Sequence, residues 1–428
     1  MKKPRPDLLD LLSRKATVIT AFAAVHGLFL LLLIPRIAGG ETYGDVGLYR
    51  EWVYQGLDEG TWQGVDVAWV YPIAAMFPMV GAAAFGYDQY MLGWFLLCTV
   101  LNFIAVLVLL NNRAAPFGWQ AAYLWITLTA VLGPLVFSRV EGISAPIVVV
   151  GLTLATTRPA LASLLLSLAT WIKVWPAGVV LALAVSSKSR LRIILVGAAV
   201  SAFMVAGVVA GGGAQHLLGF IQAQGDRGMQ LEAPLTTPGL WQAVLQSGTE
   251  IYPNTAIHTI EIQGSLADSV SVLMNPLLSV SVLFIAILIF LGVRRGANRQ
   301  DLLMVGALSL VSAMIVFNKV GSPQFMIWLT AVICVGAAFY GKAWAVPTAS
   351  IVAIAVITTL VYPLLYMQLL LALNPGVAAL LTVRNVLVIG VFGWALVTLW
   401  KLVKRVESTD DSEGTTAPLS NRVPSGIS

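Results

Sequence analysis

Charged residues are scarce in this sequence. Only 11% of its 428 residues are Asp, Glu, Lys or Arg, whereas 58% are hydrophobic. A soluble globular chain carries about 25% charged and about 45–50% apolar residues. The composition therefore excludes a soluble globular protein and predicts an all-α, polytopic membrane protein.

Cysteine and histidine are also few. The two cysteines, Cys98 and Cys334, lie inside apolar runs, which indicates no disulfide framework. The three histidines, His26, His216 and His258, lack metal-ligand spacing, so we expect no metal site built from protein side chains and no cofactor. We interpret His216 and His258 as ordinary loop histidines rather than acid–base catalysts.

Long apolar runs, bounded by charges or by Gly and Pro, fill most of the chain. Each run of about 20 apolar residues is long enough to span a membrane. The first run lacks an A-x-A cleavage site, so we expect a retained helix rather than a signal peptide. About twelve spans are predicted, at 16–37, 89–111, 119–137, 143–157, 159–172, 174–187, 191–210, 267–293, 301–317, 324–341, 344–362 and 377–402.

The positions of Lys and Arg predict the orientation of these helices. Most of them fall in alternate short connections, which is the bias typical of the cytoplasmic side. We therefore interpret the net charge of +5 as an orientation signal and not as a nucleic-acid-binding surface. The prediction is a multi-pass protein of the cell membrane (plasma or inner) with both termini in the cytoplasm. Residues 1–405 would form one transmembrane domain, and residues 406–428, rich in Ser, Thr, Asp and Gly, a disordered tail.

Two long connections, 39–88 and 211–266, fall on the predicted outer face, and long loops of this kind tend to be functional. Three predicted helices, 143–157, 159–172 and 174–187, have only about 14–15 residues. That length is about 21–23 Å, short of the roughly 30 Å hydrocarbon core. Their outer ends are expected to stop inside the membrane and to leave a cavity open to the outer face.

The first long loop contains the most acidic stretch of the chain, residues 41–78, with six of the twenty acidic residues. A solvated loop explains Asp58, Glu59 and Asp66. Asp45 differs because it lies about eight residues past the first helix, between glycines, and therefore close to the membrane plane. A carboxylate held there can accept a proton from an acceptor hydroxyl, which is the role of a general base.

The same loop ends in an amphipathic, aromatic segment. Residues Trp69–Phe85 are expected to form a juxtamembrane helix that lies along the membrane surface, and not a thirteenth span. A helix in this place would guide a lipid substrate toward the site.

Several basic residues break the orientation bias because they fall on the predicted outer face. Ionisable residues at membrane depth are costly and are functional candidates by default. Basic groups that converge on a cavity suit a lipid-linked phosphate, to which Arg offers bidentate contacts and Lys a compact charge. These residues are Arg36, Arg50, Arg139, Lys173, Arg227, Lys319 and Arg384.

Some of these residues also have a structural explanation. Arg36 and Arg384 fit snorkelling side chains at helix ends better than ligands. Arg139 and Glu141 are equally well explained as a structural ion pair. For Lys319 we favour phosphate or substrate binding over a plain interfacial lysine.

Four motifs occur in order along about residues 40–330. An early loop Asp precedes Tyr-Pro at 71–72, Ser-Arg-Val-Glu follows at 138–141, and a helix-turn Lys with a Pro three residues on lies at 173–176. The last and most specific motif is Phe-Asn-Lys-Val-Gly-Ser-Pro-Gln at 317–324. Together they resemble the GT-C membrane glycosyltransferases that use polyprenyl-phosphate-mannose. Both the first GPI mannosyltransferase of eukaryotes and the bacterial glycosyltransferase family 87 are of this type.

This resemblance implies a function and a role for the matched residues. It implies an inverting transfer of mannose from a polyprenyl-phosphate donor to a glycolipid or glycan acceptor on the outer face, with Asp45 as the catalytic base. Arg139, Lys173 and Lys319 become candidates for binding the lipid phosphate or lining the pocket around it. The full set of substrate-binding candidates is Arg50, Tyr71, Arg139, Glu141, Lys173, Arg227, Lys319 and Gln324.

One departure concerns metal binding. The eukaryotic relatives carry a second acidic residue close behind the first, whereas Val46 and Gly47 follow Asp45 here. A metal-binding pair is therefore not expected. Enzymes of this type with lipid-phosphate donors need no nucleotide diphosphate, so the missing pair need not abolish activity.

Two other functions stay open. Some relatives transfer arabinofuranose from a polyprenyl-phosphate donor, and none of these residues identifies the sugar. A lipid or solute transporter would place ionisable groups near the membrane midplane, often within inverted repeats. We find no internal repeat, and the charges cluster at the predicted outer ends of helices, which favours the enzyme.

Overall fold

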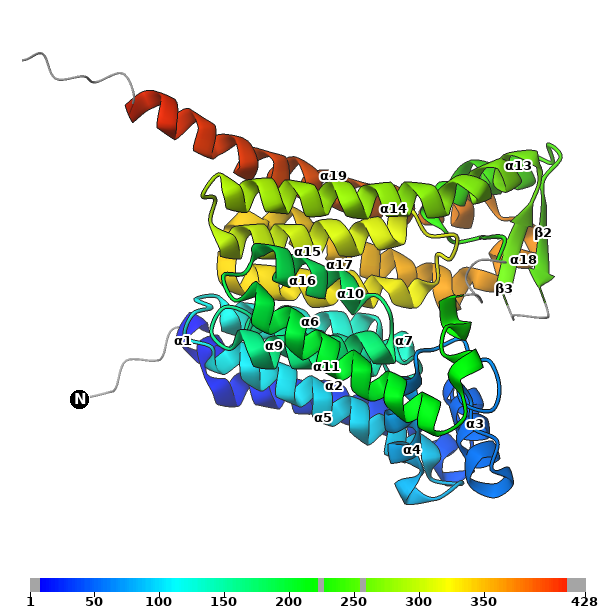
Figure 1. Cartoon of the computed structure of the whole chain (residues 1–428). Helices are drawn as coiled ribbons and strands as arrows, with labels where there is room; N and C mark the ends of the chain where they lie inside the picture. The colour runs from blue at the N-terminus through cyan, green and yellow to red at the C-terminus, as the bar shows by residue number, and fades with distance from the viewer. Residues whose placement is uncertain (1–7, 222–226, 255–258, 414–428) are drawn as a thin grey trace, which may run out of the picture.

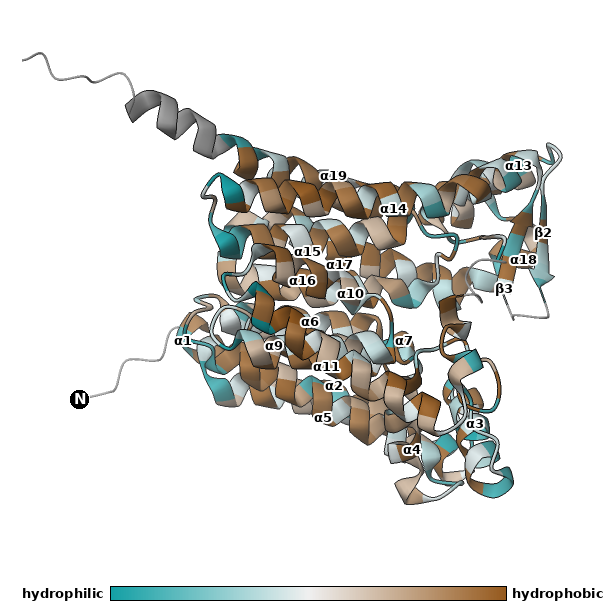
Figure 2. Cartoon of the chain, viewed as in Figure 1, coloured by the Kyte–Doolittle hydropathy of each residue, from teal (hydrophilic) through white to brown (hydrophobic). Residues whose placement is uncertain are grey.

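The computed structural model describes residues 8–221, 227–254 and 259–413, so that His258 lies outside the described residues. Its helices run roughly parallel in one bundle (Figure 1). Apolar residues dominate the middle of the bundle, and polar residues gather toward its two ends (Figure 2). The chain is an all-α polytopic membrane protein, as the composition predicts.

In the described chain, seven helical stretches are long and apolar enough to cross a membrane. Six are α2 (Lys15–Ala38), α5 (Tyr90–Asn111), α11 (Arg190–Ala210), α14 (Ser265–Arg294), α15 (Arg299–Val316) and α19 (Pro375–Glu413). The seventh combines η5 (Pro323–Phe325), α16 (Met326–Tyr340), η6 (Gly341–Trp344), α17 (Ala345–Thr359), η7 (Leu360–Leu365) and α18 (Tyr366–Ala372). The predicted number of about twelve spans is larger because it includes shorter helices and counts the seventh stretch as two spans. That number of spans stays a prediction.

Shorter helices fill the chain between α5 and α11. They are α6 (Gly118–Val131), α7 (Gly133–Val136), α8 (Glu141–Thr153), α9 (Pro159–Ile172) and α10 (Pro176–Ser186). The last three have 13, 14 and 11 residues, so the prediction of three short helices is confirmed. The predicted helix 143–157 instead runs from Glu141 to Thr153, and residues 154–157 form a turn before Pro159 starts α9.

Two predicted spans are interrupted. The predicted helix 119–137 breaks at Leu132, where Pro134 in the first turn of α7 starts a new helix. The predicted helix 344–362 gives way to η7, in which Tyr362 has the non-helical angles φ −128° and ψ 120° before Pro363. At the other end of the chain, α19 extends to Glu413, into the predicted tail, and residues 414–428 lie outside the described residues.

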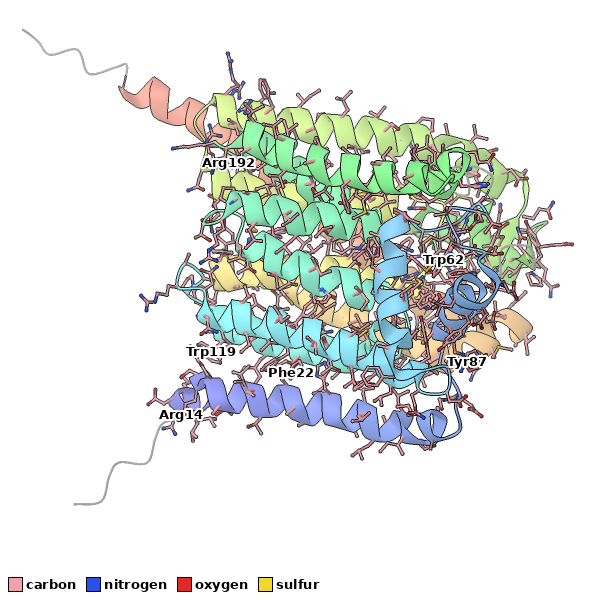
Figure 3. All side chains as sticks on the ribbon, turned by 60° about the horizontal axis from the view of Figure 1, so that its bottom comes forward. Arg14, Phe22, Trp62, Tyr87, Trp119 and Arg192 are labelled. Carbon is pink, nitrogen blue, oxygen red and sulfur yellow. The ribbon has the colours of Figure 1, made fainter. Side chains whose placement is uncertain are left out.

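The first long loop, 39–88, is mostly helical. It contains α3 (Val46–Glu59), η1 (Ile73–Ala75), α4 (Met76–Ala82) and η2 (Ala83–Phe85). The predicted helix over 69–85 therefore begins four residues late, because Pro72 disfavours the helical region for the residue before it. In Figure 3 the segment that contains α4 runs across the neighbouring helices rather than along them.

The second long loop, 211–266, contains a small sheet that the sequence does not lead us to expect. Its strands β1 (Met229–Gln230), β2 (Glu250–Asn254) and β3 (Thr259–Gln263) form an antiparallel sheet in the order β1-β3-β2. In register, Gln230 faces Glu261 and Ile251 faces Ile262. The short helices η3 (Ala214–His216), η4 (Pro234–Thr236) and α13 (Thr237–Val244) also lie in this loop.

The two long loops lie at the same end of the bundle, and the ends of the described chain, α1 (Leu8–Ser13) and the last turns of α19, lie at the other (Figure 1). Figure 3 shows Arg14, Trp119 and Arg192 at one end and Trp62 and Tyr87 at the other. Residues that the orientation bias assigns to opposite sides are thus at opposite ends of the bundle. The core of the bundle centres on α15 and α16, most of whose residues are buried.

Candidate functional site

Asp45 lies in the turn that starts α3. Gly44 before it has φ +60°, and a Cβ added there would lie 2.7 Å from the Ser138 Cβ, so this turn packs directly on the segment before α8. The contact places Asp45 beside Arg139, whose guanidinium forms an ion pair with the Asp45 carboxylate. The two side chains are 27% and 18% exposed, respectively, so the pair is largely shielded from water.

Glu141 forms a second ion pair, with Lys173. The distance from Glu141 Oε1 to Lys173 Nζ is 3.5 Å, and only 1% of the Glu141 side chain is exposed. The expected alternative, an ion pair between Arg139 and Glu141, is therefore wrong. Arg139 lies in the turn before α8 and Glu141 is the first residue of α8, and each has its partner on a different element.

Lys173 follows the last residue of α9 in an extended conformation, and Pro176 starts α10 three residues later. Its Nζ lies 4.3 Å from the centre of the Tyr71 ring, which is a cation–π contact. The Tyr71 ring packs edge-on against Trp52 and Trp69, with ring centres 6.0 and 5.5 Å away. The first long loop thus holds Lys173 on one side while α8 holds it on the other.

Tyr49 connects the two ion pairs and is not among the predicted site residues. It is fully buried one turn after Asp45 in α3, and its hydroxyl accepts a hydrogen bond of 3.2 Å from the Val140 N–H, between the two charged residues of that segment. Its ring centre lies 6.2 Å from that of Tyr71. The sequence signal for this role is slight, since it consists only of the four-residue spacing from Asp45.

The protonation of Asp45 follows from this setting. Burial raises the pKa of the Asp45 carboxyl above its usual value, and the guanidinium of Arg139 opposes this shift. The charge of Glu141 also raises the pKa of Asp45, and the charge of Lys173 lowers it, so the pKa of Asp45 depends on both ion pairs. A carboxylate with a raised pKa is the stronger proton acceptor, which suits a general base.

A cavity of about 380 Å³ lies next to Lys173. Two of its aromatic lining residues, Trp175 and Trp328, stack with ring centres 5.7 Å apart and an angle of 9° between the planes. Apolar side chains such as Val174 and Met314 form much of the remaining wall. The predicted site residues that line the cavity are Tyr71, Lys173, Arg227, Lys319 and Gln324.

Three cations from separate elements meet at this cavity. Lys173 comes from the turn between α9 and α10, Arg227 from the segment before β1, and Lys319 from the loop between α15 and η5. Among the described residues that line the cavity, none is acidic. Within the described ranges, no three His, Cys, Asp or Glu side chains gather as they would around a metal ion. The arrangement therefore suits an anion attached to an apolar group.

Two other basic residues lie elsewhere. Arg50 donates a hydrogen bond of 2.8 Å to the Gly40 carbonyl and stacks 4.1 Å above the centre of the Tyr87 ring, so it joins neither ion pair and does not line the cavity. Arg384 is only 2% exposed and donates a hydrogen bond of 2.6 Å to the Glu232 carbonyl. The expectation that Arg384 snorkels at a helix end is therefore wrong.

One comparison with known proteins found a match. The profile of glycosyltransferase family 87 matches residues 69–318, whereas no curated protein and no solved structure matches the chain. The predicted site residues inside the matched range are Tyr71, Arg139, Glu141, Lys173 and Arg227. Asp45, Arg50, Lys319 and Gln324 lie outside it. Because the match covers more than half of the 428 residues, the chain belongs to glycosyltransferase family 87 and is a membrane glycosyltransferase of the GT-C type.

Proposed function

We propose that this glycosyltransferase moves a mannosyl residue from polyprenyl-phosphate-mannose to a hydroxyl of a lipid-linked or cell-envelope glycan. The observation that carries the proposal is the Asp45–Arg139 pair, which is linked through Tyr49 and Glu141 to a cavity with three cations and apolar walls. A polyprenyl phosphate has the complementary features, an anionic phosphate and a long apolar chain.

The reaction we propose is a single displacement with inversion at the anomeric carbon. The Asp45 carboxylate accepts the proton of the acceptor hydroxyl as that oxygen forms a bond to the anomeric carbon. The bond from the anomeric carbon to the phosphate oxygen breaks, and its electron pair leaves with the polyprenyl phosphate. A β-linked donor thus becomes an α-glycoside.

The cations have the task of stabilising the leaving group. Lys173, Arg227 and Lys319 line the cavity, so they are positioned to bind phosphate oxygens, whose negative charge grows as the bond breaks. We assign Glu141 a different role from substrate contact, because its buried carboxylate pairs with Lys173 and orients that ammonium group. Gln324 offers an amide to the sugar hydroxyls, and Arg50 has no part in the proposal.

The test is transfer of label from radioactive donor lipid to acceptor by the purified protein. Asp45→Asn keeps the shape of the side chain and removes the base, so we expect the rate to fall by at least about 100-fold, as for the loss of a general base. Asp58→Asn is the matched control, because Asp58 is an exposed carboxylate at the far end of α3. Transfer at the wild-type rate by Asp45→Asn would remove Asp45 as the base.

The same assay identifies the sugar. Polyprenyl-phosphate-mannose and polyprenyl-phosphate-arabinofuranose are supplied in parallel, with membrane glycolipids as acceptors. Label from the mannose donor alone supports the proposal. Label from the arabinofuranose donor alone would replace mannose with arabinofuranose and leave the proposed chemistry intact.

We also propose that the site faces outward from the cell membrane, with both termini in the cytoplasm. The concentration of Lys and Arg in alternate short connections supports this orientation. In intact cells, a membrane-impermeant thiol reagent should label the Asp58→Cys variant and spare the Arg192→Cys variant. The reverse pattern would overturn the orientation.

A further inference from the structure

The loop that carries Lys319 is clamped by strand β1. The Gln230 N–H donates a hydrogen bond of 2.9 Å to the Lys319 carbonyl. The side-chain Oε1 of Gln230 accepts two more, from the Gly321 N–H at 3.0 Å and from the Ser322 hydroxyl at 3.2 Å. Gln230 is only 8% exposed, so the clamp is shielded from water. At a buried position, a donor or acceptor that is left without a hydrogen-bond partner is costly.

Close backbone packing tightens the same contact. A Cβ added to Gly321 would lie 2.1 Å from the Ala233 nitrogen and 2.3 Å from the Glu232 carbonyl carbon. The loop backbone therefore rests directly on the backbone that follows β1, which only glycine permits. That segment is itself anchored to α19, because Arg384 donates a hydrogen bond to the Glu232 carbonyl.

The same strand also fixes the position of Arg227, which precedes β1 by two residues. A Cβ added to Gly228 would lie 2.7 Å from Glu261 Oε2, so the carboxylate of β3 lies against the start of β1. Glu261 is 2% exposed and accepts a hydrogen bond of 2.8 Å from the Tyr252 hydroxyl of β2. All three strands therefore contribute to holding the segment that carries Arg227.

We infer that Gln230 is a positioning residue for the donor phosphate, because it sets the distance between the cations Arg227 and Lys319. This inference rests on the proposed function, in which both cations bind that phosphate. Gln230 does not itself line the cavity, so it acts through the Lys319 loop. Charge-assisted hydrogen bonds to phosphate require close contact, so a shift of one cation away from the other weakens the site.

The experiment measures binding of radiolabelled polyprenyl phosphate and of the uncharged polyprenol to the purified protein. Gln230→Met keeps the length of the side chain and removes the acceptor oxygen. We expect polyprenyl phosphate to bind about tenfold more weakly, which corresponds to about 1.4 kcal/mol. Polyprenol should bind as it does to the wild type, since it lacks the phosphate that Arg227 and Lys319 contact. A purely structural role would weaken the binding of both lipids.

Gln263→Met is the matched control, because Gln263 is an exposed glutamine of the same sheet, and we expect it to bind both lipids as the wild type does. If Gln230→Met fails to fold, Gln230→Asn serves instead, since its shorter amide cannot reach the loop. Unchanged binding of polyprenyl phosphate by the folded variant would overturn the inference alone. A wild-type protein that neither binds polyprenyl phosphate nor transfers its sugar would instead overturn the proposed function.

Discussion

The buried ion pair between Glu141 and Lys173 makes a strong prediction about stability. Only 1% of the Glu141 side chain and 19% of the Lys173 side chain are exposed. Removal of one partner from such a pair leaves an uncompensated buried charge and costs about 3–5 kcal/mol. We therefore expect Glu141→Leu and Lys173→Met each to lower the free energy of unfolding by about this amount.

The double variant distinguishes a buried pair from two independent contacts. With both charges replaced by apolar groups of similar volume, no unpaired charge remains, and such replacements are often neutral or stabilising. The double variant should thus approach wild-type stability, with a coupling energy of about 3 kcal/mol or more. The double variant should still lack transfer activity, because methionine at position 173 brings no ammonium group to the cavity.

The assay is reversible unfolding of the purified protein in mixed micelles, followed over a series of denaturing detergent concentrations. The ion pair between Arg36 and Glu41 is the matched control, because it has the same N–O distance of 3.5 Å but side chains that are 48% and 66% exposed. An exposed pair is worth about 0–1 kcal/mol, so Arg36→Met and Glu41→Leu should show little coupling. Equal and additive effects at the two pairs would refute the reasoning.

Two further predictions concern Asp45. As a base Asp45 must be ionised, so kcat/KM should fall as the pH drops through the pKa of this carboxyl, which burial raises and Arg139 lowers. Arg139→Gln removes the lowering charge, so the acidic limb of the pH profile should move to higher pH; an unmoved limb would contradict Asp45 as the titrating group. Gly44→Ala and Gly60→Ala both place a Cβ on a residue with positive φ, which costs about 1–2 kcal/mol of backbone strain each. Only the Cβ added at Gly44 also meets a neighbouring side chain, that of Ser138. Transfer should therefore fall in Gly44→Ala alone, and equal rates in the two variants would show that the Asp45 turn needs no fixed contact.

Much of the fold follows from the sequence because apolar runs and their breaks are local signals. The predicted span 16–37 corresponds to α2, and 191–210 corresponds to α11, each within one residue. The small sheet in the second long loop was not predictable in this way. Its first strand has only two residues, Met229 and Gln230, and its pairing depends on residues about 30 positions away.

Most of the residues that the structure brings together at the candidate site could be singled out from the sequence, but their pairings could not. Lys173 and Lys319 stand out because basic side chains are costly in such positions, and both line the cavity. That Arg139 pairs with Asp45, 94 positions away in sequence, depends on the packing of α3 against the turn before α8. Tyr49 carries no charge and has aromatic neighbours in the sequence, so its four-residue spacing from Asp45 is too slight a signal to distinguish its buried hydroxyl.

The stacked indoles of Trp175 and Trp328 give the cavity a built-in optical reporter. Tryptophan emission depends on the polarity of the surroundings, and these two rings line the cavity itself. An isoprenoid chain that enters the cavity makes the space beside these two rings less polar and should shift their emission to shorter wavelength. The difference between the spectra of the wild type and a Trp328→Phe variant would isolate that signal from the remaining tryptophans. Tryptophan fluorescence thus reports whether a lipid occupies the cavity, whether or not a sugar is transferred.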